Sequence, residues 1–303
     1  MNKTEFIKKH PYRYYQISDY LKETFGKKVI KLSINSNLTC PNRDGSKGTG
    51  GCIFCSEQGS GDTASNIPDQ IKLLKNKWPN ASYIAYFQNF TNTYAPVDIL
   101  RKNFYEALEH TNVLGIAIST RPDCLNEDVL ELLEEINKKY FLWIELGLQS
   151  ASDKTLDFLN TKYTCSDFEN AAAKLTKLNI PFVTHIILGL PNENKSDMIN
   201  SINLAVKNRT FGLKLHMLNI IKGTKLHDIL PDYIPFQSID EYTDLVVNLL
   251  KIIPQNITIH RLTADVLRKD LIAPAWSFKK RSILNEIYRK LNEKDLFQGC
   301  DLI

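Results

Sequence analysis

The 303-residue sequence lacks any long apolar run, and no stretch approaches the ~18 apolar residues that a membrane-spanning helix needs. Its first thirty residues are polar, aromatic and lysine-rich, and they contain no apolar core of a secretory signal. We therefore expect a cytoplasmic protein with no membrane partner. The excess of one charge is also small, at a formal +4, which permits a nucleic-acid partner without requiring one.

Cysteine is scarce, with six residues in the chain, and a chain without an export signal keeps its thiols reduced. A disulfide framework is therefore not expected. Three cysteines nevertheless lie within sixteen residues, around a loop of turn-forming residues at 41–51, and this clustering needs a chemical reason. The other three are scattered and are interpreted as small buried residues: Cys124, Cys165 and Cys300.

Short apolar runs typical of strands alternate with helical patterns along the chain. The predicted strands are 29–34, 83–87, 115–119, 141–147, 182–188 and 213–219. The predicted helices include 96–110, 126–139, 167–178 and 195–208. This alternation indicates βαβ units and a parallel sheet. Six units are too few for a complete eight-stranded barrel of ~250 residues, so we predict an α/β fold, an incomplete (β/α)₆ TIM-like barrel. An open doubly wound sheet is the alternative.

Three segments are expected to form one structural unit. Residues 1–27 are an N-terminal extension, and residues 28–235 are the partial barrel. Residues 236–303 are a C-terminal extension packed on the barrel, with a strand at 256–262 and a basic helix at 278–291. Polar or glycine-rich residues follow all six barrel strands, and in such folds the carboxyl ends of the strands build one shared site.

The spacing of Cys40, Cys52 and Cys55 points to a metal or a cluster. Structural zinc sites usually have four ligands, most often in two pairs, whereas Cys40 has no paired partner and no His-x₃₋₅-His follows. Three thiolates instead leave one iron of a cubane open to a cofactor or substrate. The spacing therefore favours an iron–sulfur cluster, while zinc held with a distant fourth ligand remains the alternative.

This cysteine loop and six further segments resemble the radical S-adenosylmethionine (SAM) superfamily. The segments are KLSINSNLTCPNRDGSKGTGGCIFC, YFQNFTNTYAP, ISTRPDCL, WIELGLQSASDKTLDFLN, HIILGLPNE, LHMLNIIKGTKL and ITIHRLTAD. The long loop is similar to the branch that includes the Elongator catalytic subunit, and more closely to the YhcC-like group of short bacterial radical SAM proteins. The likeness spans about residues 10–290.

The resemblance implies two cofactors, a [4Fe–4S] cluster and SAM. Cys40, Cys52 and Cys55 would hold three irons, and SAM would chelate the fourth through its amino and carboxylate groups. Gln149 matches a ribose-binding glutamine, and Lys162 stands beside the position of a SAM-contacting arginine. The full set of implied SAM contacts is Gln88, Asn89, Ser119, Arg121, Glu145, Gln149, Lys162, His185 and Leu190.

Several of these residues have a second interpretation. Gln149 could cap a helix that begins near Ser152. Glu145 is a carboxylate inside the barrel and so requires a partner. Arg121 could be that partner, or it could bind the carboxylate of SAM. His185 could be a hydrogen-bonded core histidine.

The resemblance also implies a substrate, the wobble uridine of tRNA, with a carboxymethylaminomethyl group at C5 converted to aminomethyl. No second cysteine cluster is present, which argues against sulfur insertion. Flavodoxin or ferredoxin is the expected electron donor. Residues proposed for the substrate mouth are Lys222, His260, Arg261 and Asp265, and residues proposed to hold phosphates are Lys279, Lys280, Arg281, Arg289 and Lys290. Alternatives are a radical SAM enzyme with a non-tRNA substrate, or a zinc-stabilised RNA-binding module without catalysis.

Overall fold

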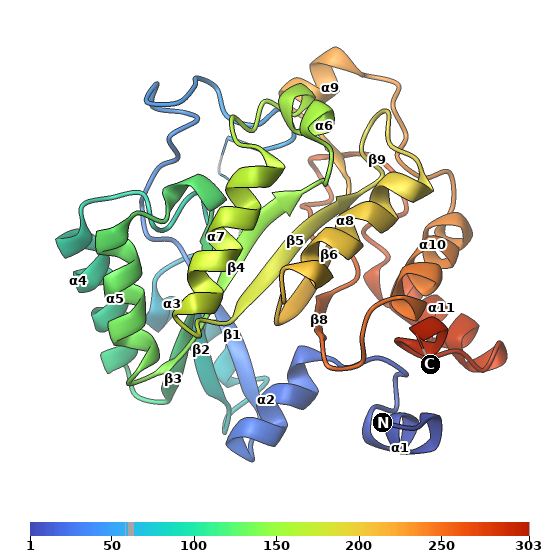
Figure 1. Ribbon diagram of the computed structural model, residues 1–303, viewed down its shortest axis with the longest axis horizontal. Coiled ribbons are helices and arrows are strands. Elements are labelled where there is room, and N and C mark those ends of the chain that lie inside the picture. The colour runs from blue at the N-terminus through green and yellow to red at the C-terminus, as the bar shows by residue number, and fades with distance from the viewer. Residues whose placement is uncertain (58, 60–63, 303) are drawn as a thin grey trace.

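Seven parallel strands form one curled sheet in the computed structural model, which describes residues 1–57, 59 and 64–302 (Figure 1). The strands are β1 (Val29–Ile34), β2 (Ser82–Phe87), β3 (Val113–Thr120), β4 (Phe141–Gln149), β5 (Phe182–Leu188), β6 (Gly212–Met217) and β8 (Thr258–Arg261). They lie in the order β1-β2-β3-β4-β5-β6-β8. Because the order never reverses, the sheet is a partial barrel and not a doubly wound sheet. The predicted fold class is confirmed.

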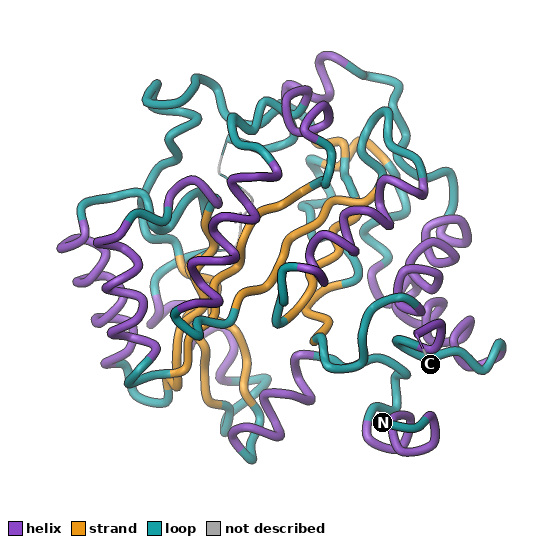
Figure 2. Tube along the Cα trace, viewed as in Figure 1, coloured by secondary structure: helices purple, strands orange, loops and turns teal. Residues whose placement is uncertain are grey.

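Helices cover the outer face of this sheet, and the long loops gather beyond the carboxyl ends of the strands, at the top of Figure 2. The helices are α1 (Lys3–Lys9), α2 (Ile17–Phe25), α3 (Ile67–Lys75), α4 (Val97–Glu109), α5 (Glu127–Asn137), α6 (Asp153–Phe158), α7 (Cys165–Lys177), α8 (Lys195–Lys207), α9 (Lys225–Ile229), α10 (Ile239–Lys251) and α11 (Lys280–Glu293). In the part of the chain that the structure describes, no helix has the length and apolar character to cross a bilayer.

Side-chain caps fix where several of these helices begin. The Asn126 and Thr164 side chains accept hydrogen bonds from backbone N–H groups in the first turns of α5 and α7. Such caps satisfy N–H groups that have no partner within the helix. The predicted helix at 167–178 therefore starts two residues earlier in the structure, directly after Thr164.

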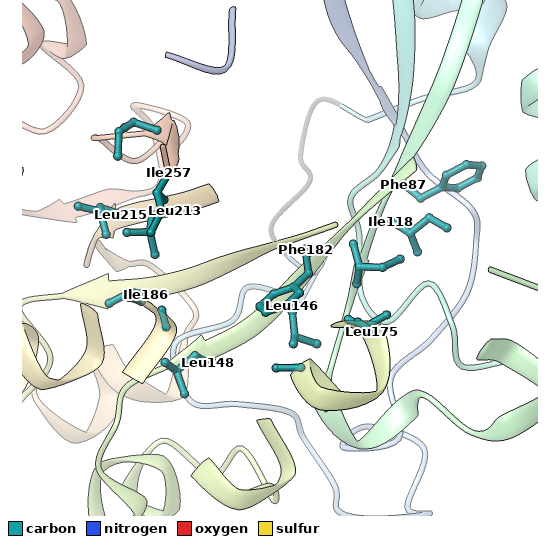
Figure 3. Close-up of a cluster of buried hydrophobic side chains, with 14 of the residues drawn as sticks. Phe87, Ile118, Leu146, Leu148, Leu175, Phe182, Ile186, Leu213, Leu215 and Ile257 are labelled. Carbon is teal, nitrogen blue, oxygen red and sulfur yellow. The ribbon is translucent and has the colours of Figure 1, made fainter. Parts of the chain in front are cut away.

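The two faces of the sheet differ because successive side chains in a strand point to opposite sides. On the outer side, Leu146 and Leu148 of β4 pack toward the helices, where Leu175 of α7 joins them (Figure 3). On the inner side, Glu145, Gly147 and Gln149 of the same strand line a cavity. The neighbouring strands repeat this alternation, so that one face of the sheet forms the apolar core and the other forms the site.

Aromatic side chains close the interior at the amino ends of the strands. The Tyr20 ring of α2 lies 4.8 Å from Phe211, and the Phe25 ring lies 5.2 Å from Phe141. Trp143 is fully buried within this group. We call these five residues the aromatic plug. This aromatic surface covers the interior at the amino ends, whereas the polar cavity lies toward the carboxyl ends of the strands.

The C-terminal segment completes the sheet and adds two short strands. β8 pairs in parallel with β6, and α11 packs against α10. The pair β7 (Ile220–Ile221) and β9 (Leu271–Ala273) is antiparallel and was not predicted. Strands of two and three residues are too short to show an alternation of apolar and polar side chains, which explains why the sequence did not reveal them.

Candidate functional site

A cavity of about 400 Å³ lies between the carboxyl ends of the strands and the aromatic plug. Its walls come from inward-facing residues of β1 to β6 and β8, from the cysteine loop, and from residues 264–267, which follow β8. The site therefore forms where the fold class places it, at the carboxyl ends of parallel strands.

The cysteine loop is anchored to the segment that joins α6 and α7. The Asn42 side chain donates a hydrogen bond to the carbonyl of Asn160, and the Asn160 side chain donates one to the carbonyl of Gly51, with N–O distances of 2.5 and 2.9 Å. The backbone N–H of Ile53 donates to the carbonyl of Leu159 at 3.0 Å. These contacts hold the loop against the barrel.

Cys40, Cys52 and Cys55 all line this cavity, and the cavity walls include none of Cys124, Cys165 and Cys300, which the structure also describes. The Cys55 thiol and the Arg121 guanidinium lower the pKa of Cys52 to about 7, while hydrogen bonding to Cys52 and burial raise the pKa of Cys55. Thiolates are the form that binds iron. Three thiols on one wall, beside a cationic group, fit a cluster with one open iron.

The structure brings eight further predicted residues to the cavity walls. They are Gln88, Ser119, Arg121, Glu145, Gln149, His185, Arg261 and Asp265. They come from five different strands or strand ends, and only the folded sheet places them together. Their predicted contacts with SAM or substrate remain predictions.

Five predicted residues do not lie on the cavity walls. Asn89 and Leu190 are buried elsewhere, Lys162 and Lys222 are exposed, and the His260 imidazole packs against Trp143. Burial lowers the pKa of His260 well below its ordinary value, so it is a neutral core residue next to the aromatic plug. A strand-end position in the sequence is therefore not enough to place a side chain in the site.

Arg121 does not pair with Glu145, and that interpretation was wrong. Its guanidinium makes two hydrogen bonds of 2.9 Å with the carboxylate of Asp123 and lies over the Tyr163 ring. The register explains the error, because Ser119 is the residue of β3 opposite Glu145 and Arg121 follows after the strand has ended. A role for Arg121 as a clamp for the SAM carboxylate stays a prediction.

Gln149 ends β4 with a φ of 67°, in the left-handed region that non-glycine residues seldom adopt. A β-bulge between β4 and β5 occurs at the same point. The alternative that Gln149 caps α6 is wrong, because the Ser152 hydroxyl accepts the hydrogen bond from the N–H of Thr155. The Gln149 side chain instead faces the cavity beside Tyr163, which is compatible with a ligand contact.

Glu145 is fully buried at the centre of a charged network. Its carboxylate accepts hydrogen bonds from the Lys214 ammonium at 2.6 Å, the His185 imidazole at 2.7 Å and the Trp143 indole at 3.2 Å. Lys31 lies 3.4 Å away. These cations hold the pKa of the Glu145 carboxyl well below its ordinary value in spite of burial, so the group is ionised.

Burial acts in the opposite direction on the bases around Glu145. Desolvation, together with the nearby Arg261 and Lys31, lowers the pKa of Lys214 to about 7. Desolvation and the Lys214 charge lower the pKa of His185 to about 4, so that His185 is neutral near pH 7. The second interpretation of His185, a hydrogen-bonded histidine within the sheet, agrees with its bond to Glu145.

Sequence reasoning missed Tyr86 and Lys214. The Tyr86 hydroxyl accepts hydrogen bonds from the Lys214 ammonium at 2.8 Å and the Ser119 hydroxyl at 2.9 Å. Lys214 had a detectable signal, because it is a lysine between Leu213 and Leu215 within an apolar strand. A charge at an inward position of a barrel strand requires a partner and so marks the site.

Three basic residues of α11 are engaged within the chain. The Lys290 ammonium is buried and lies 2.7 Å from Asp240 and 2.8 Å from Asp244, and Arg289 pairs with two glutamates of its own helix. Lys280 pairs with Asp265. Because these cations already have acidic partners, α11 offers less charge to phosphates than its sequence indicates.

Comparison with known proteins agrees with this geometry. The model of the radical SAM superfamily matches residues 39–205, and that of the radical SAM C-terminal domain matches residues 211–293. The chain is 40% identical to the uncharacterized protein YtqA of Bacillus subtilis, covering 95% of this chain and 92% of that protein. It is 33% identical to protein YhcC of Escherichia coli, covering 93% of each.

More distant matches include tRNA-2-methylthio-N(6)-dimethylallyladenosine synthase of Clostridium botulinum, 26% identical over 61% of this chain and 42% of that protein. Among solved structures, the archaeal Elp3 of Methanocaldococcus infernus has the same fold, with a TM-score of 0.64 at 15% identity over 76% of this chain and 58% of that one. The chain therefore belongs to the radical SAM superfamily, whose members use a [4Fe–4S] cluster and S-adenosylmethionine.

Proposed function

We propose that this protein is a radical SAM enzyme that remodels the C5 side chain of wobble uridine in tRNA, converting carboxymethylaminomethyl to aminomethyl. Cys40, Cys52 and Cys55 would hold the cluster. Cleavage of SAM at such a cluster supplies a 5′-deoxyadenosyl radical that takes a hydrogen atom from an unactivated carbon.

The role of the protein in this reaction is to hold the target carbon in a cavity that excludes water. The aromatic plug closes the inner end, and inward-facing polar residues surround the space above it. Gln149 and Ser119 offer hydrogen-bonding groups to SAM from β4 and β3. Exclusion of water protects a radical from side reactions and strengthens each polar contact inside the site.

The overall reaction balances without a further oxidant. Carboxymethylaminomethyluridine, SAM and water give aminomethyluridine, glyoxylate, methionine and 5′-deoxyadenosine. The bond between the amine nitrogen and the carboxymethyl carbon breaks, that carbon loses two electrons, and SAM accepts them. A donor such as flavodoxin or ferredoxin supplies the first electron, and the substrate returns it.

The observation that carries the tRNA assignment is a set of lysines around the cysteine loop. Lys162 approaches Gly48, and the Lys225 ammonium approaches Gly50. Lys222 follows Ile221 at the cavity wall. These three lysines are exposed, and none has an acidic partner among residues 1–57, 59 and 64–302. They are therefore available to phosphates where the cavity opens, unlike the cations of α11.

An anticodon loop is a suitable partner for such a cavity. Its wobble base is already unpaired, so its entry into a pocket costs little unstacking energy. Two of the more distant relatives support the choice by name, because one is a tRNA-modifying synthase and the other is an Elongator protein of Schizosaccharomyces pombe.

The test is to incubate reconstituted enzyme, SAM and reductant with tRNA that carries carboxymethylaminomethyluridine. We expect loss of the carboxymethyl mass together with formation of glyoxylate, both dependent on SAM and on Cys55. An unchanged nucleoside, with deoxyadenosine formed only when another cellular fraction is added, would instead assign the enzyme to a non-tRNA substrate.

A further inference from the structure

The inner wall of the cavity holds more positive than negative charge. Glu145 is its fully buried carboxylate and is shared between Lys214, 3% exposed, and Lys31. His185, the third partner of Glu145, is neutral near pH 7. With Lys214 in its protonated form, one negative charge therefore faces two positive charges around Glu145. A bound anion would favour that form, because it would oppose the desolvation and the neighbouring cations that lower the pKa of Lys214.

The same imbalance occurs at the rim, where β8 ends. The Arg261 guanidinium lies 2.8 Å from Asp265, but Asp265 is half exposed and also accepts a hydrogen bond from Lys280 at 3.0 Å. Asp265 therefore does not neutralise Arg261 alone. Arg261 is in turn close enough to Lys214 to lower the pKa of that lysine.

These cations are separate from those near the cysteines. Arg43 and Arg121 lie close enough to the cysteine thiols to lower their pKa values, so these arginines balance the charge at the predicted cluster site. Lys214 and Arg261 belong to β6 and β8 and face the cavity from another side. A desolvated excess of positive charge is costly unless an anion binds there.

We propose that Lys214 and Arg261 form a carboxylate-binding subsite for the substrate, with Glu145 and Asp265 orienting the two cations. This proposal rests on the proposed function in one respect, since it assigns the subsite to the carboxylate of the carboxymethylaminomethyl group. The planar guanidinium of Arg261 suits a planar carboxylate. Phosphates of a large RNA would remain at the exposed lysines outside, because Lys214 lies too deep for a polymer backbone to reach.

The first test uses a fragment in place of tRNA. N-methylglycine has the amine and carboxylate of the target side chain, and N-methylglycinamide replaces the carboxylate with a neutral amide. Each is titrated into SAM-loaded holoenzyme without reductant and followed by ligand-observed NMR. We expect wild type to bind N-methylglycine more tightly than the amide by about tenfold or more, because charge-assisted hydrogen bonds are lost with the carboxylate.

Variants locate the subsite. Arg261→Met and Lys214→Met should each remove most of that preference. Lys207→Met is the control, since Lys207 is exposed, pairs with Glu169 on the outer helices and does not line the cavity. Wild type with no preference for the carboxylate, or Arg261→Met with wild-type preference, overturns the proposal. Arg261→Met provides a second variant if Lys214→Met, which leaves a buried network incomplete, does not fold.

The second test separates the subsite from the proposed function. With tRNA as substrate, Arg261→Met should raise KM more than it lowers kcat, while Lys207→Met should change neither. If wild type converts no tRNA but prefers N-methylglycine in an Arg261-dependent manner, the tRNA assignment fails and the subsite stands. If tRNA is converted and Arg261→Met has an unchanged KM, the subsite is wrong.

Discussion

The two ends of the sheet interior have opposite chemistry although the same strands build both. Toward the amino ends, Phe141 and Trp143 of β4 belong to the aromatic plug. Toward the carboxyl ends, Glu145 and Gln149 of that strand face the cavity. The step from Trp143 to Glu145, two residues along one strand, thus separates packing from chemistry. The plug gives stability, and the open end can carry charges and free thiols because their contacts with ligands matter more than their contribution to folding.

The largest expected effect comes from removing the cluster ligands at the open end of the interior, at the carboxyl ends of the strands. Alanine at Cys40, Cys52 or Cys55 should abolish the cluster and all SAM cleavage, because each thiolate holds its own iron. Iron and acid-labile sulfide content and deoxyadenosine formation measure the loss. Alanine at Cys124, Cys165 or Cys300 is the control and should keep the brown colour. Full iron content and full SAM cleavage in any of the first three variants would contradict the assignment, and a colourless zinc protein would favour the RNA-binding alternative.

The second effect comes from truncating a side chain of the aromatic plug, which closes the amino end of the interior. Trp143→Ala should lower the free energy of unfolding by about 3–5 kcal/mol, because it leaves a cavity where a large, fully buried side chain was packed. Denaturant unfolding of the apo protein measures it. Ser119→Ala, at the open end of the neighbouring strand, removes one hydrogen bond to Tyr86 and should cost roughly 0.5–1.5 kcal/mol. Equal losses in the two variants would show that the ends do not differ in this way.

A smaller effect sharpens the comparison within β4. Gln149→Ala should weaken SAM binding several-fold or more with the cluster intact, because a buried hydrogen bond is worth about 1 kcal/mol and more when its partner is left unpaired. SAM titration of the reconstituted protein measures this. Unchanged SAM affinity would reduce Gln149 to a structural partner of Tyr163.

The smallest effect concerns the outer surface of the open end. Replacement of Lys162, Lys222 and Lys225 together by alanine should reduce the salt dependence of tRNA binding, lowering the slope of log K against log salt by about 2 in magnitude if all three contact phosphates. Binding at several salt concentrations measures the slope. Arg289→Ala on α11 is the control and should leave it unchanged, because Arg289 is already paired with Glu286 and Glu293.

The sequence revealed the fold well and the site in part. Buried strands such as 182–188 were predicted with their observed ends because continuous apolar runs bounded by turns have few alternatives. The cysteines and Gln149 were placed at the cavity because the cysteines lie in the loop after β1 and Gln149 lies at the carboxyl end of β4. Contacts between distant segments could not be predicted in the same way. The partner of Glu145 was sought on the next strand, whereas the register brings Lys214 from 69 residues away.

The hydrogen bonds from Asn42 to Asn160 and from Asn160 to Gly51 have a consequence for what happens to the protein when its cluster is lost. A zinc finger unfolds when its metal is removed, because the metal alone holds its loop. Here the Asn42 and Asn160 side chains and the Ile53 backbone tie the cysteine loop to the barrel through hydrogen bonds that use no cysteine thiol. These hydrogen bonds offset part of the entropy cost of ordering the loop, so the cluster does not offset it alone. We therefore expect loss of the cluster to leave the barrel folded, so that repair requires a new cluster and no refolding.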